Sequence, residues 1–528
     1  MKILNKNIAL LLLAAISITS CDLDKYPEGG TILDEQKKEV IENTPERLSA
    51  EVNGLFAGLT IYQTLYTKKG VSLHFDFGVP AFSFMMEASG QDVVGPDAGY
   101  NWFRNSMRYT DRVNTSDNTD FIWTTFYNNI KTANDILSTV DPTTTDPTLK
   151  GYLGQAYATR AYDYLNLVQT FQFTYVGNEN KLAVPIVTHE MTTEELSNNP
   201  RATVKEVYDL IISDLNKALE LFEGYSRPAK NMFDKQIVYG LRARANLIMQ
   251  NWQQAASDAE AAMAGYTPYS LAEVSKPTFN SAAASSWMWA ILITPENSVV
   301  KSGIINWPSH MCSFTGNGYT TLVGQLRSIN NKLWEKIAST DIRKQWWVDE
   351  NLSSSLSDNI VIDGEPASKY FKWIPYTNVK FHAYQDIPDN AQNASDWCLM
   401  RVEEMILIQA EALAMGGNIA RAKEVLEGFV KANRNPEYTV TATSPQEFQD
   451  EVWFQRRIEL WGEGFSLFDL HRLHKPVLRK GTNYADLYQY EMEPDHKILL
   501  YRIPEGEINM NEGISDADNN ESVPPPTI

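Results

Sequence analysis

Two widely separated stretches of the chain repeat one pattern, in which a helical segment, a short turn and a second helical segment follow one another. Residues 237–249 and 253–263 form the first pair, and residues 401–415 and 419–429 form the second. Apolar side chains recur at helical spacing in all four segments. Both pairs carry alanines that would let two antiparallel helices approach closely. The pattern predicts tetratricopeptide-like units, with generic packing of helix pairs as the alternative.

Other segments extend this prediction of a mainly α fold. Residues 122–137 and 149–170 form a third, weaker candidate pair, and Thr203 with Glu206 marks a helix start of the capping-box type. Residues 264–400 differ, because they are rich in Ser, Asn, Gly, Pro and aromatic residues. We expect a tetratricopeptide-like scaffold that carries an irregular, loop-rich region with short strands. Residues 41–528 are expected to form one domain, with the loop-rich insertion at about 264–400.

The N-terminus has the features of a secretory signal. Lys2 and Lys6 precede an apolar stretch, residues 8–16, that is too short to span a bilayer as a helix. Cys21 follows Ile18-Thr19-Ser20, which resembles the lipobox of bacterial lipoproteins. We therefore expect a lipoprotein signal peptide at residues 1–20. We also expect acyl chains on Cys21 that anchor the protein to the membrane, with residues 21–40 as the lipid anchor and its polar tether. The alternative is a plain signal peptide with an incidental cysteine.

The charge of the chain restricts its partners. Without the two lysines of residues 1–20, 44 basic residues face 66 acidic ones, a net charge of −22. Such a chain repels phosphate backbones, which argues against nucleic-acid binding. It also makes anionic substrates unexpected unless basic residues gather locally. Besides Cys21, the sequence contains Cys312 and Cys398, which allow at most one disulfide.

A group of charged residues raises the question of catalysis. Glycosidases use two carboxylates about 5 to 10 Å apart. Here the carboxylates stand beside alanines and leucines on predicted amphipathic helices, which favours structural ion pairs. His471 and His474 lack further ligands at metal spacing. We expect no catalytic residue, no metal and no cofactor. The charged group comprises Glu403, Glu404, Glu411, Arg456, Arg457, Glu459 and Glu463.

Aromatic residues in loops are the candidates for ligand binding. Flat aromatic faces pack against the C–H groups of a sugar, and planar polar side chains bind its hydroxyls. The segment 91–102 combines such residues with glycine and proline, and residues 306–319 form a second candidate loop. For the tryptophans the alternative is an aromatic ring that fixes its loop to the core. The predicted ligand-binding residues are Asp92, Tyr100, Asn101, Trp102, Trp307 and Tyr319.

Five segments, in order, resemble the SusD/RagB family. Two of them depart slightly from the family pattern. Gln455 stands where an acidic residue is common, and Arg502 replaces a proline often found before Ile-Pro, without the usual Gln-Asn-Pro-Gly that follows. The segments are residues 123–134 (WTTFYNNIKTAN), 158–164 (ATRAYDY) with Val184-Pro185, 401–412 (RVEEMILIQAEA), 454–465 (FQRRIELWGEGF) with 468–472 (FDLHR), and 496–508 (HKILLYRIPEGEI).

This resemblance implies a function. Members of the family are lipid-anchored at the outer membrane and exposed at the cell surface, and they bind a nutrient in an early loop. They pass an oligosaccharide, or sometimes a peptide, to a SusC-like TonB-dependent barrel. We therefore expect a binding protein and not an enzyme. Capture of peptides, a tetratricopeptide scaffold of envelope assembly and a secreted glycoside hydrolase are the alternatives.

Overall fold

The computed structural model describes residues 34–527. By its contacts, the chain divides at Arg47 into two units. The first contains helix α2 (Asp34–Asn43) and the start of the 3-10 turn η1 (Pro45–Leu48). The second, residues 48–527, contains all the elements considered below. The predicted signal peptide, Cys21 and the tether as far as residue 33 lie outside the described residues.

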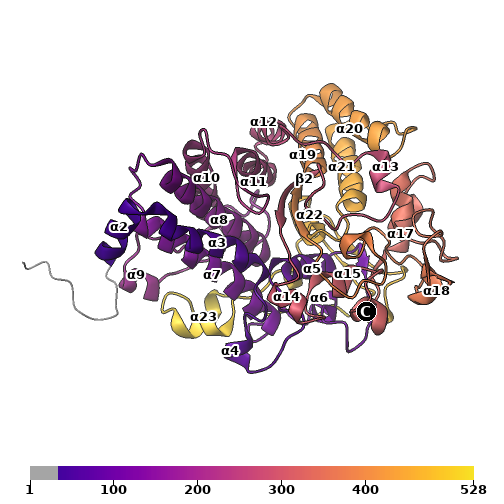
Figure 1. Ribbon diagram of the computed structural model, residues 1–528, viewed down its shortest axis with the longest axis horizontal. Helices are drawn as coiled ribbons and strands as arrows, with labels where there is room; N and C mark the ends of the chain where they lie inside the picture. Colours follow the sequence, from indigo (N-terminus) through magenta and orange to yellow (C-terminus); the bar gives the residue numbers. More distant parts are fainter. Residues whose placement is uncertain (1–33, 528) are drawn as a thin grey trace, which may run out of the picture. The chain divides into compact units, whose positions relative to one another are not determined.

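Long helices form a scaffold in the second unit (Figure 1). Along the chain, α7 packs on α8, α8 on α10, α10 on α11, α11 on α12 and α12 on α19, and α19 contacts both α20 and α21. The predicted mainly α fold with paired helices is confirmed. The helices are α3 (Ser49–Ala57), α7 (Asp117–Thr139), α8 (Pro147–Phe171), α10 (Val204–Leu221), α11 (Lys235–Ile248), α12 (Trp252–Ala262), α19 (Val402–Met415), α20 (Ile419–Asn433) and α21 (Pro445–Glu459).

Capping side chains determine where these helices begin. The predicted box at α10 is confirmed, since Thr203 accepts the amide of Glu206 and the Glu206 carboxylate accepts the amide of Thr203. Ser444 begins α21 in the same way. Ser116 accepts the amide of Asn118 at α7, so this helix starts five residues before the predicted position. Each cap satisfies backbone donors that a helix leaves without partners.

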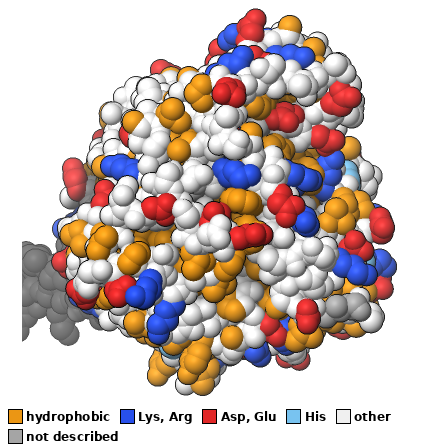
Figure 2. Space-filling view, turned by 90° about the vertical axis from the view of Figure 1, so that its right-hand side faces the viewer, with side chains coloured by type: hydrophobic (Ala, Val, Ile, Leu, Met, Phe, Trp, Pro, Cys, Tyr) orange, Lys and Arg blue, Asp and Glu red, His pale blue; other side chains and the backbone are white. Residues whose placement is uncertain are grey.

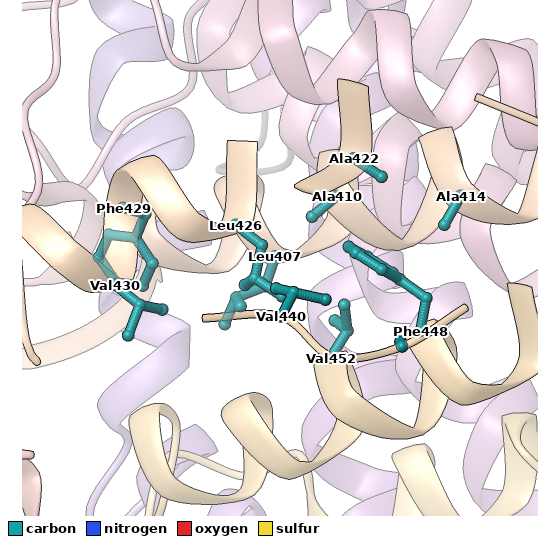
Figure 3. Close-up of a cluster of buried hydrophobic side chains, with 11 residues drawn as sticks. Leu407, Ala410, Ala414, Ala422, Leu426, Phe429, Val430, Val440, Phe448 and Val452 are labelled. Atoms are coloured by element: carbon teal, nitrogen blue, oxygen red, sulfur yellow. The ribbon is translucent and has the colours of Figure 1, made fainter. Parts of the chain in front are cut away.

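The predicted helix pairs are present with small shifts. Trp252, expected in the turn, is the first residue of α12, and α20 runs four residues beyond the expected end at Phe429. Between α19 and α20, Ala410 and Ala414 face Ala422, and phenylalanine and valine side chains close the cluster from α21 (Figure 3). Alanines at the contact let the two helices approach, so the larger side chains can fill the space on either side.

The loop-rich region is confirmed as well. Its longest strand, β2 (Trp287–Ile291), pairs antiparallel with β6 (Trp397–Arg401), and every residue of both strands is buried. Trp287 and Trp289 therefore belong to the core. The other elements are α13 (Leu271–Val274), α14 (Ser298–Lys301), α15 (Trp307–Met311), α16 (Tyr319–Leu322), α17 (Asn331–Lys336), α18 (Ala367–Tyr370), β3 (Ser328–Ile329), β4 (Val361–Ile362), β5 (Glu365–Pro366), η3 (Ile342–Trp346) and η4 (Tyr384–Asp386).

Helix α5 (Val79–Ser89) is buried along its whole length, and distant segments meet around it. Its Glu87 accepts the amides of Gly464 and Phe465, and strand β1 (Val93–Val94), which follows it, pairs with β3. The remaining elements are η2 (Gly58–Thr60), α4 (Tyr66–Lys69), α6 (Arg104–Arg108), α9 (Thr193–Ser197), α22 (Ser466–Arg472), α23 (Glu505–Met510), β7 (Val477–Leu478), β8 (Glu491–Met492), η5 (Asp486–Tyr488), η6 (Lys497–Leu499) and η7 (Asp516–Asp518).

The charged residues of segments 401–412 and 454–465 form buried ion pairs. Glu459, at the end of α21, accepts hydrogen bonds from three guanidinium groups. The nitrogen–oxygen distances are 2.7 Å to Arg434, 2.8 Å to Arg401 and 3.2 Å to Arg343. Burial raises the pKa of Glu459, but Arg434 and Arg401 outweigh this effect and hold it well below the ordinary range. The carboxylate is therefore charged and fully paired, unlike a catalytic acid.

Further pairs extend this cluster, which we call the Glu459 network. Lys380 and Arg401 both pair with Glu463, at 2.6 and 2.9 Å. Outside the network, Arg244 pairs with Glu404 and Arg472 with Glu411. The structural interpretation of the charged motifs is confirmed. The network joins four cations and four carboxylates, namely Arg343, Lys380, Arg401 and Arg434 with Asp341, Glu403, Glu459 and Glu463.

Three further observations concern the rest of the molecule. In the part of the chain from residue 34 to 527, no helix is long and apolar enough to cross a bilayer. Cys312 and Cys398 are both buried and both free. On the face shown in Figure 2, basic and acidic side chains are interspersed with apolar ones.

Candidate ligand-binding site

The predicted loop 91–102 is held at both ends by buried polar contacts. Asp92 forms an ion pair with Arg457 at 2.6 Å, and its carbonyl accepts the indole N–H of Trp461 at 2.9 Å. Asn101 donates to the carbonyl of Pro96 and accepts from Arg327 at 2.9 Å. Both predicted residues are almost fully buried. Their side chains hold the loop in place, and Asn101 also lines the cleft described below.

Between these two anchors the loop contributes to a group of stacked rings. Tyr319, the first residue of α16, stacks on His310 of α15 with centroids 4.7 Å apart, and His310 stacks on Phe77 at 5.4 Å. Tyr100 extends this column outward, 6.4 Å from Tyr319. Its exposed fraction is 61%, whereas that of Tyr319 is 6%. The column therefore runs from the core to the surface.

A second stack lies beside the first. Trp102 lies against His74 with ring centroids 4.8 Å apart and an interplanar angle of 15°. His74 also contacts Tyr319 edge-on, and Nδ1 of His74 is hydrogen-bonded to the Tyr319 hydroxyl. We call these six residues the aromatic cluster: His74, Phe77, Tyr100, Trp102, His310 and Tyr319. Three of the six predicted ligand-binding residues, Tyr100, Trp102 and Tyr319, are thus brought together.

The two imidazoles of the cluster are uncharged at neutral pH. Burial lowers the pKa of His74, and burial together with the charge of Arg327 lowers that of His310 well below its ordinary value. His310 is fully buried, and its Nε2 lies 3.0 Å from the carbonyl oxygen of His74. Because the carbonyl can only accept, Nε2 carries the proton. The cluster therefore presents neutral aromatic surface, which suits the C–H faces of a sugar.

A surface cleft of about 450 Å³ adjoins Trp102. Residues Leu73 and Phe75 form an apolar part of its wall, and Asn105 and Thr115 contribute polar groups. The only charged side chains in this lining are Arg104 and Asp117, as far as the described residues show. Such a mixture of an aromatic ring, apolar wall and few polar groups is typical of small-molecule sites.

Trp307 lies elsewhere, and the expectation that it contacts a ligand is not supported by its position. Its exposed fraction is 1%, and its indole N–H donates to the carbonyl of Ser395 at 2.8 Å. Its ring packs against Trp397 and Phe381. Trp307 begins α15 and fixes this short helix to the core, which corresponds to the alternative considered for loop tryptophans.

The sequence did not reveal His74 and His310 as partners of the predicted rings. His310 belongs to the second candidate loop, but its stacking partners Phe77 and Tyr319 come from different elements. His74 lies more than 200 positions from Tyr319. A signal was present nonetheless, since His74 is followed by aromatic residues in a glycine-flanked segment, as are the other rings of the cluster.

The described residues thus form a mainly helical scaffold that carries an aromatic cluster beside a cleft. Comparison with known families places this scaffold. Residues 83–247 match a family described as starch-binding and associating with the outer membrane, and residues 318–521 match the SusD family. A SusD-like protein of Formosa agariphila is 23% identical over 360 residues, which cover 62% of this chain and 67% of that protein. The chain belongs to the SusD/RagB family, as its five motifs predicted.

Solved structures show the same fold. A SusD-like carbohydrate-binding protein from Bacteroides vulgatus superposes with a TM-score of 0.72 at 24% identity, over 90% of this chain and 98% of that one. A laminarin-binding SusD-like protein gives a TM-score of 0.63 at 18% identity, over 90% and 99% of the two chains. These likenesses extend across nearly the whole described chain.

Proposed function

We propose that this protein captures an oligosaccharide at the aromatic cluster, on the cell surface, and passes it to a TonB-dependent transporter of the outer membrane. The observation that carries the proposal is the convergence of Tyr100, Trp102 and Tyr319 beside a cleft, on a SusD/RagB scaffold. Tyr100 is the exposed end of the ring column, and Trp102 lines the cleft. These two rings form the primary contact with the ligand, and Tyr319 supports them from behind.

Two properties of the cluster favour a sugar as ligand. Its rings are stacked on one another, and His310 and Tyr319 are also held by hydrogen bonds, so little side-chain freedom is lost when a ligand binds. Its imidazoles are neutral, so the stacked surface does not demand a charged partner. The matched family is described as starch-binding, and one structural neighbour is named for laminarin. These findings support glycan capture over peptide capture, which remains an outcome of the test.

Attachment to the membrane belongs to the same proposal. Cys21 follows a lipobox-like sequence at the end of an apolar segment, and acylation there anchors the mature protein. The polar residues that follow act as a tether that lets the folded part reach its transporter. Labelling with a radioactive or clickable fatty acid tests this step, with Cys21→Ser as the control that loses the label.

Calorimetric titration tests the binding step. The mature chain from residue 21, with Cys21→Ser, is titrated with laminari-oligosaccharides, malto-oligosaccharides and a peptide digest. We expect saturable binding to one oligosaccharide class and a loss of about ten- to hundredfold in affinity with Trp102→Ala, as is typical of a tryptophan hot spot. Trp453→Ala is the matched control, because Trp453 is also partly buried but lies on α21, outside the cluster.

Either of two results would contradict the proposal. Binding of peptides and of no oligosaccharide would replace glycan capture with peptide capture. Binding of no small ligand, together with many protein partners in a pull-down from membranes, would favour a scaffold of envelope assembly. The proposal itself predicts one dominant partner in that pull-down, a TonB-dependent barrel.

A further inference from the structure

Arg104 is the first residue of α6 and lies two positions after Trp102, just beyond the end of the loop 91–102. Its side chain is partly buried and lines the cleft beside Trp102. Its backbone amide donates to the carbonyl of Asn101 at 3.0 Å, which fixes its Cα relative to the aromatic cluster. The guanidinium group is therefore delivered to the same wall of the cleft as the indole ring.

This guanidinium group has no partner within the part of the chain that the structure describes. Every other arginine between residues 48 and 527 forms a side-chain hydrogen bond or ion pair there. The contrast is sharpest within the segment itself. Arg108 pairs with Asp97, and Arg112 pairs with Asp111. Arg104, four positions before Arg108, has no such carboxylate partner among the described residues. Because acidic residues outnumber basic ones, 66 to 46, a shortage of carboxylates does not explain the difference.

The charge in the cleft is also positive. Asp117 is the other charged residue of the lining, and Lys69 neutralises it at a distance of 2.8 Å. The nearby Lys68 pairs with Asp120 at 2.7 Å. The unneutralised charge of this wall is thus that of Arg104.

We propose that the oligosaccharide bound here carries an anionic group, a uronate carboxylate or a sulfate ester, which pairs with Arg104 while a sugar ring packs on the aromatic cluster. This inference rests on the proposed function of the site. The planar guanidinium fork matches a carboxylate or sulfate with two parallel hydrogen bonds. Its position beside Trp102 lets one saccharide unit reach both groups.

The inference qualifies what composition predicts. A chain with an excess of 20 negative charges repels anions in general, unless basic residues gather locally. One unpaired arginine in a cleft is enough to reverse this locally, because the charge at contact distance outweighs charges beyond the Debye length of about 8 to 10 Å. Screening by salt should therefore weaken the attraction at Arg104 less than it weakens the repulsion by distant acidic residues.

Affinity electrophoresis of the mature protein tests the inference with three polysaccharides: laminarin as the neutral probe, polygalacturonate as the uronate probe and carrageenan as the sulfated probe. We expect retention by one of the two anionic probes. Arg104→Gln should weaken this binding about ten- to hundredfold, as for loss of a charge-assisted hydrogen bond. Arg104→Lys keeps the charge without the fork and should give an intermediate affinity.

Two variants serve as controls. Arg421→Gln removes an exposed arginine that pairs with Glu424 on α20, away from the cleft lining, and should leave retention unchanged. Trp102→Ala should reduce binding of whichever polysaccharide is retained. The thermal midpoint of each variant, measured in parallel, shows that it is folded.

The outcomes separate the two proposals. Retention by laminarin alone, lost with Trp102→Ala and unchanged with Arg104→Gln, overturns the anionic ligand and leaves glycan capture intact. Retention by an anionic probe that Arg104→Gln does not alter also overturns the role of Arg104. Retention by none of the three, with intact folding, counts against the proposed function and removes the inference with it.

Discussion

The Glu459 network and the aromatic cluster use charge and aromatic surface in opposite ways. In the network, four cations and four carboxylates are buried together, and Glu459 receives donors from three arginines. In the cluster, the titratable imidazoles are neutral, and rings continue outward until Tyr100 is 61% exposed. The network is closed, because its charges satisfy one another. The cluster is open, because the Tyr100 ring is exposed and the neighbouring Arg104 side chain has no partner in the described residues.

The comparison shows that residue type does not reveal function, whereas the state of its contacts does. The arginines of the network and Arg104 are chemically identical, and so are Trp307 and Trp102. The members with complete contacts stabilise the fold, and the members with an unfilled face or donor are available to a ligand. When one partner of a buried ion pair is removed, the other charge stays buried without compensation, and the fold loses stability.

Breaking the network should have the largest effect. Glu459→Gln leaves three guanidinium groups around a neutral amide, so the free energy of unfolding should fall by about 3–5 kcal/mol, as for other buried pairs that lose one partner. Chemical denaturation measures this change. Lys131→Gln, which removes an exposed pair with Asp135, is the control and should change little. An equally small effect of Glu459→Gln would show that the network does not stabilise the fold.

The two tryptophans should respond differently. Trp307→Phe removes the hydrogen bond to the Ser395 carbonyl and leaves a void in the core, so the unfolding free energy should fall by about 2 kcal/mol. The affinity for the oligosaccharide should be unchanged, because the indole is buried. Denaturation and calorimetry together check this. A loss of affinity without a loss of stability would show that Trp307 takes part in ligand binding.

Tyr100→Ala should give the converse result. Its ring is largely exposed, so the thermal midpoint should change little. The affinity should fall about tenfold, equivalent to about 1.4 kcal/mol, because a stacking surface is lost. An unchanged affinity in calorimetry would show that the ligand does not contact the Tyr100 end of the ring column.

The dependence of stability on pH should distinguish the paired charges of the Glu459 network from buried neutral groups such as His382. Burial lowers the pKa of His382 to about 4 from an ordinary 6.5, and its Nδ1 accepts the amide of Ala383 at 2.8 Å. The unfolded chain therefore binds a proton between pH 6.5 and 4 that the folded chain does not. The stability is fully present above pH 6.5 and falls as the pH decreases towards 4, by about 1 kcal/mol between pH 6 and pH 5.

His382→Asn tests this assignment, because its side-chain oxygen can accept the same amide without titrating. The variant should be less sensitive to pH in this interval when unfolding is followed by denaturant at each pH. The Glu459 network contributes little between pH 6 and pH 5, because an unfolded glutamate has an ordinary pKa of 4.5 and takes up its proton mostly below this interval. An identical pH profile for both proteins would exclude His382 as a source.

The fold was predictable because its signals are local. Alanines such as Ala410 and Ala422 lie on helices joined by one turn, and Thr203 caps its own helix, so a short window of sequence contains the whole pattern. Even there, Trp252 was misplaced, since the exact start of a helix depends on a few backbone contacts. The site was predictable only in part. Tyr100 and Trp102 were identified from an aromatic pair in a glycine-rich loop.

Other parts of the site depend on contacts between distant residues. Trp307 stands before a proline in a loop just as a binding residue could, but Ser395, 88 positions away, determines its burial. The Asp92 carboxylate pairs with Arg457, and His310 stacks on Phe77, more than 200 positions earlier in the chain. Spacing within one segment contains no information on such pairs, and the lack of a partner for Arg104 is likewise a property of the fold.

The crystal structure of the protein with the oligosaccharide that binds most tightly in calorimetry tests the central claim most directly. We predict density for a sugar ring against Tyr100 or Trp102, next to the cleft. Density for the ligand at another surface, with the aromatic cluster empty, would contradict the claim that the open end of this cluster is the binding site.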